Sequence, residues 1–338
     1  MDFCCTKVSS NSQMTRIINY CILLPVSFLL IFNSCTLEED SRAKVELKVG
    51  RFEQDFFKLS PENVFDSLPK LKKIYAPFFT NTDDEFWRNI LKDSVHLRLY
   101  AHVRDSFKYI NKEIEQIVPV LERYKYHFNP PFEKFYLFTY VSRLDYDYPV
   151  IFSDSLLFIA LDLYLGEEHP AYGNQPRYLA REHDRKFIPI DVAYAISESL
   201  IIEQKQTSET LLSHMIREGI KLYITRKLLP EEKEYNIFKY TKEQLDFCEE
   251  NERNIWLYFV NNKLLFDVNY MTKKNFIDPA PFTKLGTEFD NQIPGRLGRW
   301  IGYKIVSQYM RKNKNISLKD LIKSTDYHSI FYQANYKP

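Results

Sequence analysis

The sequence predicts an α+β fold that is predominantly α-helical, with several helices around a small sheet. Glycine is scarce, with 8 residues in 338, against an average usage of roughly 7 %, so few tight turns and few phosphate-binding loops are expected. Aromatic residues reach 16 %, which indicates bulky packing. Apolar residues recur at three- and four-residue steps over much of the chain, and one middle segment is instead dense in aromatic and β-branched residues.

The charge of the chain is nearly balanced, with 46 Lys plus Arg and 45 Asp plus Glu. A nucleic-acid-binding protein would need a basic face, so we expect no nucleic-acid partner. Apolar residues make up 45 % and charged residues 27 % of the chain, which is typical of a folded globular protein and not of a disordered one.

The N-terminus resembles the signal peptide of a bacterial lipoprotein. Arg16 precedes an apolar run at 22–32, which is shorter than the ~20 residues needed to span a bilayer but has the length of a signal peptide core. The run ends in Asn-Ser-Cys at Cys35, as in a lipobox, where the thiol receives a diacylglycerol and the peptide is cut before it. We predict a signal peptide over 1–34, with Met14 as an alternative start. A plain signal peptide with an incidental cysteine is the alternative.

Residues 35–43 are then predicted to be the lipidated N-terminus and an acidic tether. Two or three acyl chains on Cys35 would hold the protein on the lipid bilayer, because each buried CH₂ contributes ~0.8 kcal/mol. We expect a lipid-anchored protein of the cell envelope, at the outer membrane, on either its periplasmic or its surface side. Cys248 is left without a cysteine partner, so a buried free thiol is expected there.

The mature chain is predicted to form one helical domain over 44–338. Residues 44–59 begin with alternating apolar and polar positions, which predicts a strand that leads into a helix. Ser60 and Pro61 predict a helix start, and helices are expected from there to about residue 126. Pro119 lies in the last of them and is expected to kink or restart it.

A small sheet is predicted near 133–165, where "KFYLFTYVS" and "PVIFSDSLLFIALDLYLG" indicate two or three strands. An irregular loop, "EEHPAYGNQPRY", follows. The remaining predicted elements are helices over 190–204, 207–228, 241–249 and 251–262, a long loop bounded by Pro279 and Pro294, a helix within "PGRLGRWIGYKIVSQYMRKN", a short helix near Leu318 and an aromatic tail.

The helix pair over 190–228 carries the arrangement closest to a catalytic motif. Zinc hydrolases of the HExxH type bind zinc through two histidines four residues apart, with a glutamate base between them and a third ligand from a later helix. If Glu198 is taken as the base, Ser197 and Ile201 occupy the histidine positions, and neither binds zinc as an imidazole does. Glu218, followed by Gly219, stands where a glutamate ligand would be expected.

The spacing alone leaves two interpretations of these glutamates. They are either solvated residues or ion-pair partners at a helix edge, for example Glu218 with neighbours near Arg217 or Lys221, or they are the remnant of a peptidase site. The histidines of the chain are scattered singly, so neither a metal nor a cofactor is expected. Gly298 and Gly302 predict close packing of another element around Trp300, since the motifs of phosphate-binding loops are absent.

The chain resembles the gliding-motility lipoprotein family GldB of Bacteroidetes over nearly all of its mature length. The resemblance rests on Cys35 and on the segments "RFEQDFF" at 51–57, "LDLYLGEEHPAY" at 161–172, "LLSHMIREGIKLYITRKLLP" at 211–230 and "PGRLGRWIGYKIVSQYM" at 294–310. It implies a degenerate zincin-like core of the gluzincin type, distantly related to HExxH zinc peptidases but without the metal-binding histidines.

The resemblance also implies a membrane-anchored component of the gliding and associated protein-secretion apparatus. On this hypothesis the protein is not an enzyme, and it acts by contacting other envelope motility or secretion proteins. The alternative is a metal-dependent peptidase with an atypical ligand set, such as Glu198, Glu218 and one remote histidine. The missing pair of imidazoles favours the non-catalytic hypothesis.

Overall fold

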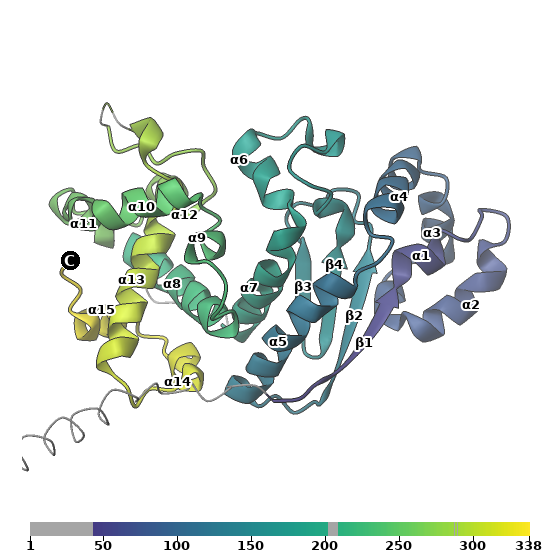
Figure 1. Cartoon of the computed structure of the whole chain (residues 1–338), viewed down its shortest axis with the longest axis horizontal. Helices are drawn as coiled ribbons and strands as arrows, with labels where there is room; N and C mark the ends of the chain where they lie inside the picture. Colours follow the sequence, from purple (N-terminus) through teal and green to yellow (C-terminus); the bar gives the residue numbers. More distant parts are fainter. Residues whose placement is uncertain (1–42, 202–208, 287, 289) are drawn as a thin grey trace, which may run out of the picture. The chain divides into compact units, whose positions relative to one another are not determined.

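In the computed structural model, helices surround a four-stranded sheet, and residues 43–201, 209–286, 288 and 290–338 are described (Figure 1). The predicted α+β, predominantly helical class is confirmed. Residues Arg42–Pro338 form one compact unit. The predicted signal peptide, Cys35 and the tether up to residue 42 lie outside the described residues. So do residues 202–208, which include the end of the first helix of the predicted pair and the start of the second.

The sheet has the strand order β1-β2-β4-β3. β1 pairs in parallel with β2, β2 pairs in parallel with β4, and β3 and β4 form an antiparallel hairpin. Three of these strands fall in the predicted segment near 133–165, and β1 joins them from the predicted strand after residue 44. The strands are β1 (Glu46–Arg51), β2 (Lys134–Tyr140), β3 (Val150–Ser153) and β4 (Leu156–Ala160).

Both faces of the sheet are covered by helices, because apolar residues point to both sides of its central strands. In β2, Phe135 and Leu137 face the larger core, which includes residues of α5 (Asn111–Phe128) and α7 (Ile188–Leu200). Phe138 faces a second core of largely aromatic side chains from the helical segment between residues 52 and 91. Figure 1 shows these two groups of helices on opposite sides of the sheet. The alternation follows from the two-residue period of a strand.

The N-terminal helices differ from the predicted ones at two points. Ser60 is in a turn rather than at a helix start, because its backbone N–H donates to Asn63 Oδ1 at 2.9 Å. Pro119 neither ends nor restarts its helix, since α5 continues through it and the neighbouring Ile117, Val120 and Leu121 are fully buried. The other helices of this part are α1 (Phe52–Phe56), α2 (Val64–Ile74), α3 (Asp84–Ile90) and α4 (Ser94–Ser106).

The C-terminal half is helical beyond the predicted elements. The predicted loop after residue 166 contains the short α6, and the predicted aromatic tail forms α15, which Asp326 caps through its side chain. None of the described helices is both long and apolar enough to cross a membrane. The helices are α6 (Arg177–Ala180), α8 (Leu211–Leu228), α9 (Glu234–Ile237), α10 (Lys242–Glu250), α11 (Glu252–Asn261), α12 (Tyr270–Ile277), α13 (Leu297–Lys312), α14 (Leu318–Lys323) and α15 (Tyr327–Ala334).

Helices α8 and α13 cross at two glycines, which confirms the predicted close packing near Trp300. A Cβ atom added to Gly302 would overlap the backbone carbonyl of Met215, and one added to Gly219 would overlap the backbone of Gly302. Trp300 is 1 % exposed beside this crossing. Only residues without a side chain allow two helix backbones to approach this closely.

Candidate functional site

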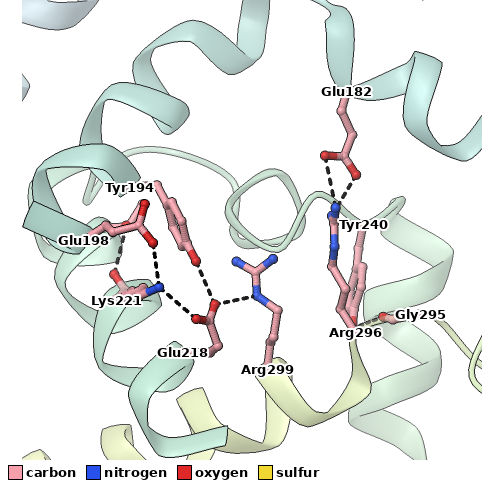
Figure 2. A network of polar contacts seen from close by, with 10 residues as sticks. Glu182, Tyr194, Glu198, Glu218, Lys221, Tyr240, Gly295, Arg296 and Arg299 are labelled. Atoms are coloured by element: carbon pink, nitrogen blue, oxygen red, sulfur yellow. Dashed lines mark hydrogen bonds and ion pairs between the residues drawn. The ribbon is translucent and has the colours of Figure 1, made fainter. Parts of the chain in front are cut away.

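The crossing of α7, α8 and α13 brings the two glutamates of the predicted site together. Glu198 lies on the last turn of α7, and Glu218 lies in the middle of α8 next to Gly219. Lys221, one turn after Glu218, places its Nζ 2.8 Å from Glu198 Oε1 and 2.9 Å from Glu218 Oε1 (Figure 2). The lysine ammonium therefore bridges the two carboxylates.

The two positions that histidines would occupy serve packing. Ser197 is fully buried, donates a hydrogen bond to Ala193 O at 2.7 Å and lies 3.2 Å from Thr225 Oγ1. Ile201 is 8 % exposed and belongs to the large apolar core. It follows the last residue of α7 with an extended backbone, so the helical spacing of four residues between the two histidine positions is not kept.

Glu218 is the centre of a buried polar network, which Figure 2 shows. Its carboxylate accepts a hydrogen bond from Tyr194 Oη at 2.7 Å and lies 3.2 Å from Arg299 Nε, in addition to its contact with Lys221. Burial would raise the pKa of Glu218, but Arg299, Lys221 and Tyr194 outweigh burial and lower that pKa to about 2. The ion-pair interpretation of Glu218 is confirmed, and its side chain is mostly buried, with 14 % exposed, rather than solvated.

The close helix crossing is what places Arg299 beside Glu218. Arg299 precedes Gly302 by three residues, so it lies on the same side of α13, one turn away. Glu218 precedes Gly219, the glycine that faces Gly302. The ring of Tyr194 lies under the guanidinium of Arg299, with 5.2 Å between the ring centroid and Cζ.

A second buried charge cluster lies beside the first. Arg296 makes two contacts with Glu182, at 2.7 and 3.3 Å, and Lys239 Nζ lies 2.7 Å from Asp191 Oδ1. Tyr164 Oη donates to the other oxygen of Asp191 at 2.8 Å. Burial would raise the pKa of Glu182, but Arg296 and Lys239 lower it to about 2.

The two clusters line one cavity of about 350 Å³, between α7, the start of α13 and the loop that leads into β3. Tyr146 and Tyr148 of that loop are 38 % and 58 % exposed at its wall. Glu198 of this cavity was predicted from the sequence, but Arg296 and Arg299 were not, because their segment indicated only close packing. Tyr194 and Lys239 were not predicted either, since no local pattern gives a signal for them.

A family model described as "Gliding motility protein GldB" matches residues 34–338. The chain belongs to the GldB family. No curated protein and no solved structure matches it. The match starts one residue before Cys35 and runs to the end of the chain, so it covers the cavity and both charge clusters of this GldB-family protein.

His214 of this GldB-family chain lies on α8 one turn before Glu218, whereas two other histidines, His102 and His169, contact each other. Their ring centroids are 4.6 Å apart. Within the described residues, no group of three or more His, Cys, Asp or Glu side chains is arranged to hold a metal ion. The chemistry that the site residues offer is therefore that of paired carboxylates, guanidinium groups and an ammonium.

Proposed function

We propose that this protein is a membrane-anchored envelope lipoprotein and a non-catalytic component associated with gliding motility or the linked protein-secretion machinery. On this proposal it acts through protein–protein contacts, and its helix pair is a peptidase-like scaffold without the metal. The observation that carries the proposal is the position of Lys221, whose ammonium lies between the two carboxylates, Glu198 and Glu218.

A fixed ammonium cannot perform the chemistry of a zinc ion at this place. A catalytic zinc needs three protein ligands and an open position, where it lowers the pKa of a bound water or polarises a carbonyl. Lys221 donates its N–H groups to the carboxylates instead, and its side chain is only 6 % exposed. Burial would lower the pKa of Lys221, but Glu218, Tyr194 and Glu198 raise it above its usual value, so the side chain stays charged at neutral pH.

The lipoprotein part of the proposal is supported by the sequence around Cys35. The short apolar run followed by Asn-Ser-Cys has the order of a lipobox, and the match to the family begins at residue 34. Acylated Cys35 would anchor the protein in the bilayer, and the domain would then meet other envelope proteins.

The protein is expected to contain substoichiometric zinc when it is produced as a soluble chain that starts after Cys35 and is incubated with zinc before gel filtration. Lys221 blocks the two carboxylates, and Ser197 and Ile201 offer no imidazole. Metal analysis by mass spectrometry checks this, with Glu218→Ala and the exposed-site control Glu115→Ala measured in parallel. Stoichiometric zinc that is lost only in Glu218→Ala, or chelator-sensitive peptide hydrolysis, would support the metallopeptidase alternative instead.

Removal of the anchor cysteine is expected to release the protein from the membrane fraction. The variant is Cys35→Ala with the signal peptide exchanged for a cleavable general one, so that an uncut leader cannot hold the chain on the membrane. The matched control is Cys248→Ala, because Cys248 is a fully buried free thiol and its loss should leave the protein on the membrane. Immunoblots of fractionated cells measure both. Retention of Cys35→Ala through alkaline washing would contradict lipid anchoring.

A further inference from the structure

Arg299 enters the cavity with only one edge of its guanidinium bound by protein. Its Nε lies 3.2 Å from Glu218 Oε2, in an ion pair that lacks hydrogen-bond geometry. Figure 2 shows its two Nη atoms pointing away from Glu218, and among the described residues they have no hydrogen-bond acceptor. The other two cations of the cavity are matched by carboxylates, Arg296 by Glu182 and Lys239 by Asp191.

We propose that this cavity binds a ligand carboxylate on the outer edge of Arg299. The two Nη groups present parallel N–H donors, which match the two oxygens of a carboxylate. The ion pair with Glu218 and the ring of Tyr194, whose centroid lies 5.2 Å from Cζ, orient the guanidinium before a ligand arrives. The inference rests on the proposed binding role and deepens it, because it names the chemical group that a partner would insert.

The charges around Arg299 favour a carboxylate over a phosphate. Glu182, Asp191 and Glu198 line the same cavity, and their cationic partners are already engaged. A ligand with a single negative charge gains the contact with Arg299, whereas the second charge of a phosphate would be repelled by these side chains.

The walls of the cavity indicate that the carboxylate belongs to a peptide. A volume of about 350 Å³ is at the small end of ligand cavities and suits one or two amino-acid residues. Tyr148, 58 % exposed beside Pro149 and Val150, offers an aromatic face against which the rest of the ligand can pack. A C-terminal carboxylate and an acidic side chain both present the required group.

The test compares three short peptides on the full-length lipoprotein in detergent micelles. The first is acetyl-Tyr-Ala with a free C-terminal carboxylate, the second is its amide, and the third is the amide with aspartate in place of alanine. Saturation-transfer NMR titrations measure their affinities. We expect the amide to bind at least about tenfold more weakly than one of the two carboxylate peptides, and the peptide that binds shows whether the terminus or the side chain is recognised.

Variants link the binding to Arg299. Arg299→Lys keeps a positive charge beside Glu218 but loses the paired donors, and it should weaken carboxylate binding about tenfold. Arg253→Lys, on an exposed part of α11, is the control and should change nothing. Tyr148→Ala lies outside the buried network and should weaken binding severalfold without altering stability, so the inference stays testable even if Arg299→Lys folds poorly.

Three results would overturn the carboxylate assignment: equal binding of all three peptides, no binding of any, or displacement of the carboxylate peptides by an equal concentration of inorganic phosphate. These results are distinct from a failure of the proposed function. Stoichiometric zinc or peptide hydrolysis would refute the non-catalytic role, whereas a zinc-free, inactive protein that ignores carboxylates would refute the cavity assignment alone.

Discussion

Replacement of Gly302 by valine is expected to lower the free energy of unfolding by at least about 3 kcal/mol, because the added side chain overpacks a helix crossing. The new Cβ would overlap the Met215 carbonyl, which belongs to the backbone of α8 and cannot rotate away. The two helices must separate, and the buried residues that both contribute to the core lose contacts. A protein of this kind has a total stability of roughly 5–15 kcal/mol, so the variant is expected to be largely unfolded at moderate urea concentrations.

Gly302→Ala is the sharper form of the same test. In an unpacked helix, alanine is about 1 kcal/mol more favourable than glycine, so helix propensity alone predicts that the variant is more stable. The backbone overlap at the helix crossing predicts the opposite, a less stable variant. Urea unfolding of the soluble domain measures the difference in the free energy of unfolding, provided that the slope of this free energy against urea concentration is unchanged. Gly173→Ala is the control, since its Cβ would approach only Pro170 O, at 3.3 Å, and a change below about 1 kcal/mol is expected. A Gly302→Ala variant as stable as the parent would show that the helices do not approach this closely.

The outcome at Gly302 also bears on the site, because the crossing positions Arg299. A variant that separates α8 from α13 should remove Arg299 from Glu218 even where the chain still folds. The binding of carboxylate peptides and the stability of the domain are therefore expected to fall together in Gly302 variants.

The sequence was sufficient for those elements whose period or composition is local. The strands near 133–165 and the helix pair were predicted because alternation and three- to four-residue steps are visible within one segment. Close packing at Gly302 was predicted from glycines spaced four apart. The helix start at Ser60 and a helix restart at Pro119 were wrong, because the side chain of Asn63 and the burial of one face of α5 outweigh local propensity.

The site was predicted only in part, for a related reason. Glu198 and Glu218 were found because a known motif supplies a spacing, and Lys221 was named because it follows Glu218 by one turn. The bond from Lys221 to Glu198 and the contacts of Glu182 with Arg296 join residues that are far apart in the sequence. No period in a single segment encodes such pairs, so the balance of charges in the cavity could be read only from the folded chain.

Glu218→Gln is expected to destabilise the domain by about 3 kcal/mol at neutral pH, since it leaves Arg299 and Lys221 buried with a neutral neighbour. The magnitude is consistent with the titration of Glu218. Burial opposes ionisation, but Arg299 and Lys221 lower its pKa from 4.5 to about 2, and each unit of such a difference corresponds to about 1.4 kcal/mol. Glu198→Gln is the control. The side chain of Glu198 is 60 % exposed, so this variant should lower the free energy of unfolding by less than about 1 kcal/mol.

The lowered pKa of Glu218 also predicts how the stability of the domain depends on pH. A carboxyl whose pKa is lowered in the folded state stabilises the protein fully above the unfolded pKa of 4.5, and this stabilisation disappears as the pH falls towards the folded value of about 2. Glu182 behaves alike, with a folded pKa of about 2. Urea unfolding between pH 7 and pH 3 should therefore show a steep loss of stability below pH 4.5 in the parent protein. The loss should be shallower in Glu218→Gln, which retains only Glu182, and shallower still in the double variant with Glu182→Gln. Parallel curves for all three proteins would mean that these carboxyls titrate normally, and that the two charge clusters do not hold the helices around the cavity together.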